Sequence, residues 1–130
     1  MRTFSAEEIR FFDGHPGALA LYAAFLDRLE EAVGPVRIDP RKTQISLFRR
    51  YMLGCVSLLP VRRRADRPRE YITVTLGLPR RLSSPRVDAA AEAAPGRFTH
   101  HILIGDESEI DDELMAWARE AAAFADRGQG

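Results

Sequence analysis

The sequence predicts one α+β domain with two layers, in which a mainly antiparallel sheet of about five strands carries helices from both chain ends on one face. Near both ends of the chain, apolar residues recur every three or four positions, as on one face of a helix. Between them, short segments alternate apolar and polar residues, as strands do. At 130 residues the chain fits one domain, with a core over about residues 4–125 and a flexible tail at 126–130.

The N-terminal part predicts two helices. Ser5 followed by Glu8 forms a capping box, which begins a short helix that ends at Asp13-Gly14. Pro16 suits the first turn of a second helix, because its missing N–H costs nothing there. This helix ends at Gly34-Pro35. Its apolar stripe consists of Leu19, Tyr22, Phe25, Leu26, Leu29 and Val33.

The middle of the chain predicts the strands. Their segments are residues 36–38, 45–47, 55–59, 71–78 and 98–104. Residues 80–96 are predicted to be a long connection with a helical turn near 87–89. A final helix is predicted over 109–125. Its apolar stripe consists of Ile110, Leu114, Trp117, Ala121 and Phe124.

Two amphipathic helices cover only one face of such a sheet, so the other face is expected to be polar and partly open. The strand residues expected on this open face are Gln44, Ser46, Ser57, Tyr71, Thr73, Thr75, Thr99 and His101.

The net charge is zero, but the charge is unevenly distributed. Residues 1–34 hold three basic and six acidic side chains (−3), residues 35–104 fourteen and five (+9), and residues 105–130 two and eight (−6). If the arginine-bearing loops meet at one sheet edge, they form a positive rim that suits phosphate or nucleic acid. The alternative is a solvated surface, neutralised in part by the acidic last helix. With the polar face, the candidate ligand-binding residues are Arg62, Arg63, Arg64, Arg67, Arg80, Arg81, Arg86, Arg97, His101, Tyr71, Thr73, Thr75 and Gln44.

The remaining chemistry-bearing residues give little support for catalysis. His100 and His101 are adjacent on a strand, so their side chains point to opposite faces and do not share one metal ion. His100 is expected in the core and His101 on the polar face. Cys55 is the only cysteine and is expected to be a small core residue. No metal site, cofactor motif or catalytic motif is present, and no cofactor is expected.

The chain has no apolar run long enough for a membrane span, and its N-terminus, MRTFSAEEIR, lacks the apolar stretch of a signal peptide. With a single cysteine, this indicates a cytoplasmic protein.

Four segments carry a family resemblance: FFDGHPGALALYAAF, RKTQISLFRR, LGLPRRLSSPR and PGRFTHHILI, in this order. Together they resemble the bacterial family called domain of unknown function 5655, over nearly the whole chain. The resemblance implies a small α+β fold, and it implies no activity and no catalytic residues. The layout alone is also similar to frataxin-like and MmcQ/YjbR-like domains.

We therefore expect a non-catalytic binding domain for nucleic acid or another polyanion, which uses the arginine rim and the open polar face. One alternative is a protein-interaction or homo-oligomerisation module, in which the acidic helix ends meet the basic rim of another copy. Another is an enzyme for a small anionic substrate, with His101 and Arg97 in its site. That enzyme would need a closed pocket around His101.

Overall fold

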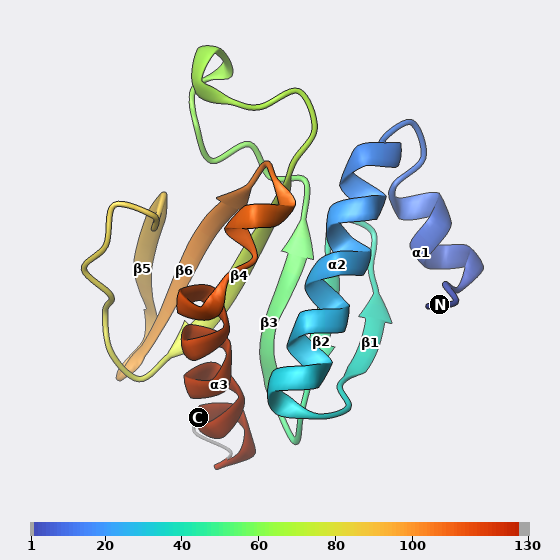
Figure 1. The fold of residues 1–130 in the computed structure, drawn as a ribbon. Coiled ribbons are helices and arrows are strands. Elements are labelled where there is room, and N and C mark those ends of the chain that lie inside the picture. Colours follow the sequence, from blue (N-terminus) through green and yellow to red (C-terminus); the bar gives the residue numbers. More distant parts are fainter. Residues whose placement is uncertain (1, 128–130) are drawn as a thin grey trace.

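A computed structural model describes residues 2–127, in which a six-stranded antiparallel sheet carries two long helices on one face (Figure 1). The predicted two-layer α+β class is therefore confirmed. The helices are α1 (Ala6–Phe11), α2 (Pro16–Val33) and α3 (Asp112–Asp126), with short 3-10 turns η1 (Arg64–Asp66) and η2 (Glu107–Glu109). The strands are β1 (Arg37–Pro40), β2 (Ile45–Phe48), β3 (Met52–Ser57), β4 (Ile72–Leu78), β5 (Ala89–Ala94) and β6 (Arg97–Ile104). Of the predicted flexible tail, residues 128–130 lie outside the described residues, whereas Asp126 ends α3.

The strands lie in the order β1-β2-β3-β4-β6-β5, and each neighbouring pair is antiparallel. The edge strand β5 lies where the sequence predicts a connection with a helical turn, and that prediction is wrong. Five alanines and one glutamate give β5 no apolar alternation that sequence reading would recognise. It becomes a strand because a turn at Gly96, with φ of 74°, folds it back onto β6.

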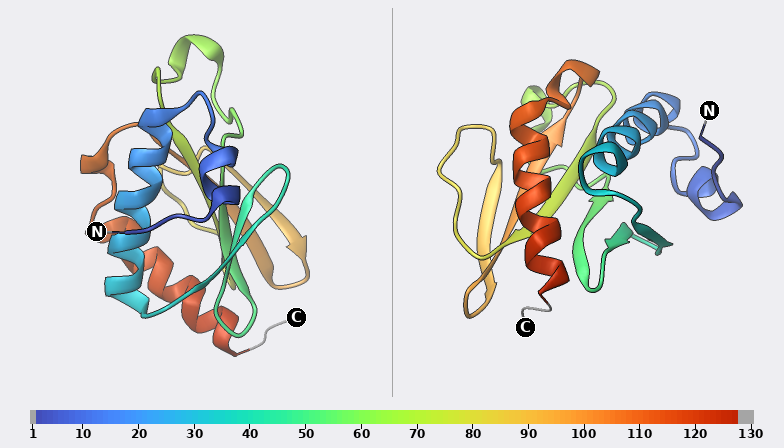
Figure 2. Two further views of the ribbon diagram at one scale, coloured as in Figure 1. Left: turned by 90° about the vertical axis from the view of Figure 1, so that its right-hand side faces the viewer. Right: turned by 60° about the horizontal axis from the view of Figure 1, so that its bottom comes forward.

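The core lies between the sheet and the two long helices. Helices α2 and α3 pack on the face of β4 that carries Ile72, Val74, Leu76 and Leu78. The predicted stripe of the last helix is buried as expected. Figure 2 shows no helix on the opposite face of the sheet. Within residues 2–127, none of the helices has both the length and the apolar character needed to cross a membrane.

The N-terminus is fixed to the core by the predicted capping box. Ser5 accepts a hydrogen bond from the Glu8 backbone N–H (3.1 Å), and the Glu8 carboxylate accepts one from the Ser5 N–H (2.8 Å). Glu8 is buried and also accepts a hydrogen bond from the Tyr22 hydroxyl. Burial and the neighbouring carboxylate raise the pKa of Tyr22, so its hydroxyl keeps the proton it donates. This contact joins α1 to α2.

His100 is a core residue, as the sequence predicts. It is fully buried, and both ring nitrogens have backbone partners. Nε2 accepts a hydrogen bond from the Leu82 N–H (2.9 Å), and Nδ1 donates to the Leu76 carbonyl (3.4 Å). These partners assign the proton to Nδ1 in the neutral ring. Burial, as the largest cause, lowers the pKa of His100.

The lowered pKa of His100 predicts a loss of stability in weak acid. In the unfolded chain this histidine takes up a proton below about pH 6.5, whereas the folded state resists protonation. The free energy of unfolding should therefore be highest above about pH 6.5 and should decrease as the pH falls below that value. Urea unfolding at about pH 7.5 and about pH 5.5 measures the difference.

The control for this prediction is His100→Gln, which keeps a hydrogen-bond acceptor but does not titrate. The variant should be less sensitive to acid than the original chain. Because the pKa of His101 is also lowered, by burial, His101→Gln is measured in parallel to subtract its share. If His100→Gln kept the full acid sensitivity, the assignment to His100 would be wrong.

Candidate anion-binding surface

The arginine-bearing connections lie at two opposite ends of the sheet. Strand β3 ends at Ser57 beside Thr73, near the start of β4, so the connection that carries Arg62 to Arg69 leaves from that end. It is the green loop at the top of Figure 1. Arg80, Arg81 and Arg97 lie at the other end, where Leu78 pairs with Phe98. The arginine-bearing loops therefore do not form the single positive rim that the sequence suggested.

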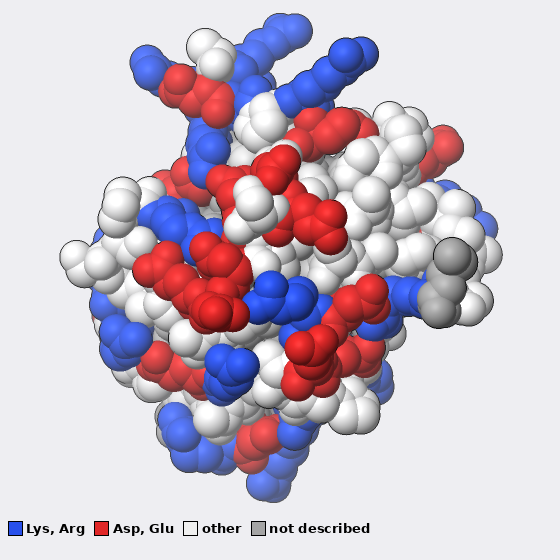
Figure 3. All heavy atoms as spheres, viewed as in Figure 1, with Lys and Arg blue, Asp and Glu red and all other residues white. Residues whose placement is uncertain are grey.

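The acidic last helix neutralises several of these arginines. Arg80 donates two hydrogen bonds to the Glu120 carboxylate, from Nε (2.8 Å) and from Nη2 (2.9 Å). Arg86 contacts Asp111 at 2.7 Å and also donates to the Glu109 carbonyl. Other α3 acids pair in the same way: Glu113 with Arg86, Asp112 with Arg28, and Asp126 with Arg49. Figure 3 accordingly shows basic and acidic side chains interleaved over the helix face, with basic side chains projecting at the top. The acids of α3 that lie at these contacts are thus paired within the chain.

The arginine loop, defined here as residues 62–70, keeps part of its charge free. Arg62 is bound to Asp88 (2.7 Å), and Arg63 to Asp66 (3.0 Å). Within residues 2–127, Arg64, Arg67 and Arg69 form no ion pair. The Nε atom of Arg67 is buried and has no hydrogen-bond partner among the described residues. The exposed Arg64 and Arg69 and the half-buried Arg67 therefore bring to this end three guanidinium groups without an acidic partner among the described residues.

The base of the arginine loop is anchored to the sheet and to α2. The Tyr71 hydroxyl donates to the Leu58 carbonyl (3.1 Å), and the Thr73 hydroxyl donates to the Leu59 carbonyl (2.7 Å). Glu70 accepts a hydrogen bond from the Gly17 N–H at the start of α2 (2.8 Å). The ring of Pro68 lies directly against Gly105, where no side chain would fit. The loop is thus held on both sides, which reduces the entropy lost when it binds a ligand.

Tyr71 and Thr73 are therefore parts of this anchor. Thr73 is fully buried, so it does not belong to an exposed binding face. Ser46 and Ser57 are buried as well. The chain after β3 lies over Thr73 and Ser57, since the Leu59 carbonyl accepts from the Thr73 hydroxyl and the Leu59 N–H donates to Ser57, whereas Gln44 contacts Ser46. The polar face is consequently smaller than the sequence predicts.

What remains of the polar face centres on His101. The Thr75 hydroxyl lies 2.8 Å from His101 Nδ1 across β4 and β6, and Cys55 pairs with Thr75 on the other side. Burial lowers the pKa of His101 and raises the pKa of the Cys55 thiol, so both groups are neutral near pH 7. A neutral, buried thiol is a poor nucleophile. These side chains form a packed polar row with no cavity of their own among the hollows described.

Two further predicted residues lie on or beside this face. The guanidinium of Arg97 lies over Gly77, close to where a side chain would stand. Gln44 donates to the Ser46 hydroxyl (2.9 Å). Within residues 2–127, no three His, Cys, Asp or Glu side chains are grouped to hold a metal ion.

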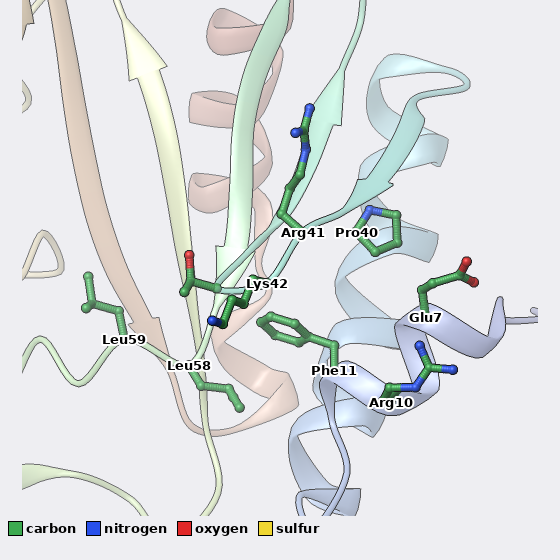
Figure 4. A pocket seen from close by; sticks show the side chains of 9 residues that line it. Glu7, Arg10, Phe11, Pro40, Arg41, Lys42, Leu58 and Leu59 are labelled. Atoms are coloured by element: carbon green, nitrogen blue, oxygen red, sulfur yellow. The ribbon is translucent and has the colours of Figure 1, made fainter.

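A hollow of about 680 Å³ lies at the same end of the sheet as the arginine loop (Figure 4). It is formed by α1, by the turn between β1 and β2, and by the chain that leaves β3. Its lining residues are Glu7, Arg10, Phe11, Pro40, Arg41, Lys42, Thr43, Leu58 and Leu59. Sequence reasoning missed this site, because three separate segments build it and none carries a recognisable motif.

A comparison with protein families gives a match over most of the chain. The family model described as "Domain of unknown function (DUF5655)" matches residues 10–125, which span α2, the whole sheet and nearly all of α3. No curated protein and no solved structure matches the chain.

Proposed function

Because the chain belongs to the domain of unknown function 5655 family, whose description gives no activity, we propose a function from its surface: it is a non-catalytic domain that binds nucleic-acid phosphates. The binding surface is the end of the sheet that carries the arginine loop. The lone Cys55 fits the reducing cytoplasm, and we propose that the domain acts there.

One observation carries this proposal: among residues 2–127, Arg64, Arg67 and Arg69 have no acidic partner, and they lie on a loop whose base is anchored. Arginine presents a planar fork of N–H groups that matches two oxygens of a phosphate. An anchored loop loses less conformational freedom on binding than a mobile one. Arg62, by contrast, is held by Asp88 and belongs to the support, whereas Arg63 stays exposed beside Asp66.

Further positive charge lies at the same end of the sheet. Lys42 is exposed in the turn between β1 and β2, and Arg10 is exposed at the end of α1. Neither forms an ion pair within residues 2–127. Long-range attraction from such unpaired charges increases the association rate of a polyanion. Contacts to phosphate carry no sequence information, so binding should depend little on base sequence.

The salt dependence of binding tests this proposal. A fluorescently labelled oligothymidylate is titrated with the protein while anisotropy is recorded, at salt concentrations from about 50 to about 200 mM. Each phosphate contact on a single strand contributes about −0.7 to the slope of log K against log salt. The three free loop arginines alone predict a slope of about −2, which is a loss of about fifteenfold over this range. Affinity that stays constant with salt would refute the proposal.

A further inference from the structure

The hollow beside the arginine loop has an apolar interior. The Phe11 ring points into it from α1, and Leu58 and Leu59 lie across from the ring, with Pro40 at the side (Figure 4). Leu59 is 47% exposed, so the apolar side of the hollow is open to an incoming group. A volume of about 680 Å³ lies in the range of pockets that hold small organic groups.

Two cations that form no ion pair in the described part of the chain flank this interior. In Figure 4 the Lys42 ammonium lies on one side of the Phe11 ring, and the Arg10 guanidinium lies on the other. Arg41 points away from the ring and is bound to Asp39 (2.8 Å). Glu7 lies on the Arg10 side and offsets part of that charge, so Lys42 is the stronger of the two anion contacts.

We propose that this hollow receives one unstacked base of a single-stranded nucleic acid, packed against Phe11, with the phosphates on either side of that base held by Lys42 and Arg10. The inference rests on the proposed phosphate binding and adds two things to it: the strandedness of the ligand, and a base site away from the arginine loop. In a duplex the bases are paired and stacked, so a duplex would not fill the hollow.

The arrangement of charge selects this occupant. A fatty acid or another simple amphipathic anion has one charged group, which uses one cation and leaves the other without a partner. A single strand repeats the order phosphate, apolar base, phosphate, and so presents an anion on both sides of the group in the hollow. Aromatic stacking tolerates any base, in keeping with phosphate contacts that carry no sequence information.

The position of the hollow also fits the arginine loop. The chain leaves the hollow at Leu59 and reaches Arg62 three residues later, where the loop begins. A strand with one base against Phe11 can therefore continue over Arg64, Arg67 and Arg69. The two sites would then be occupied by different nucleotides of one ligand.

The test compares oligothymidylate with an oligonucleotide of equal length in which every position is abasic. Both probes carry the same phosphates, and only one has bases. The original chain should bind oligothymidylate about tenfold or more tightly than the abasic probe. Phe11→Ala should remove most of this ratio. Leu59→Ala, at an exposed position in the same hollow, should reduce it without affecting the fold.

The matched control is Ile9→Ala. Ile9 is 54% exposed on the same helix and does not line the hollow, so this variant should keep the full ratio. Equal affinity of the original chain for both probes would refute base binding and leave phosphate binding intact. If neither probe binds, the proposed function itself fails. Tighter binding of an Asp-Leu-Asp peptide than of oligothymidylate would assign the hollow to a protein partner and also overturn the inference.

Discussion

Replacing Arg64, Arg67 and Arg69 together by alanine should weaken oligothymidylate binding by about a hundredfold at about 50 mM salt, since each phosphate contact is worth roughly 1 kcal/mol or more. The slope of log K against log salt should also become less steep by about 2, because three phosphate contacts are lost. None of the three side chains forms an ion pair within residues 2–127, but Arg67 is half-buried, so circular dichroism first establishes that the variant is folded. Anisotropy titration measures both quantities.

A charge-matched variant separates a binding surface from a general effect of charge. Arg50, Arg81 and Arg119 also form no ion pair within the described residues, and they lie away from the arginine loop. Arg50→Ala, Arg81→Ala and Arg119→Ala combined remove the same three positive charges. This control should lose only a few-fold in affinity, through the weaker long-range field. Equal losses in the two triple variants would contradict a specific role for the arginine loop.

The largest expected effect on stability belongs to Gly54→Ala. Gly54 lies in β3 opposite Leu76 of β4, and a Cβ atom there would lie 2.0 Å from the Thr75 carbonyl oxygen. The new Cβ is fixed to the main chain of β3, and the carbonyl oxygen belongs to the main chain of β4. Relief of the clash therefore requires these two central strands to separate. We expect a loss of roughly 4 kcal/mol or more in the free energy of unfolding, which is a large part of the stability of a domain of this size.

Chemical denaturation followed by circular dichroism measures this loss. Gly14→Ala is the control, because Gly14 has a φ of 78° and open space around it. In Gly14→Ala the free energy of unfolding should fall by only about 1–2 kcal/mol, because alanine is unfavourable at a positive φ. A similar loss in the two variants would show that β3 and β4 accommodate a side chain at Gly54.

The elements that the sequence predicted well are those whose signals lie close together in the chain. The capping box of Ser5 and Glu8, the buried stripe of α3 and the buried His100 each follow from spacing within a few residues. Their local pattern and their burial agree, and such positions are read reliably. The sequence analysis missed strand β5 because alanine has little preference for strands. The segment is a strand because it pairs with β6.

The candidate site was less predictable, because its determinants are distant in sequence. Arg80 pairs with Glu120, 40 residues away, and Arg49 with Asp126, 77 residues away. Nothing in the local sequence distinguishes these arginines from Arg64 and Arg69, which form no ion pair within residues 2–127. Thr73 fits the open face by alternation alone, and only the chain that crosses above it makes it buried. The hollow likewise depends on segments that meet only in the fold.

The central claim, that this domain binds the phosphates of nucleic acid, is tested most directly with a ligand that lacks them. Oligothymidylate and a peptide nucleic acid of the same sequence and length carry the same bases, but the second has an uncharged backbone. We predict that the oligonucleotide binds with a dissociation constant of about 1–100 μM near physiological salt, and that the peptide nucleic acid binds at least about tenfold more weakly. Equal affinity for the two ligands, or no binding of either at low salt, would contradict the proposed function.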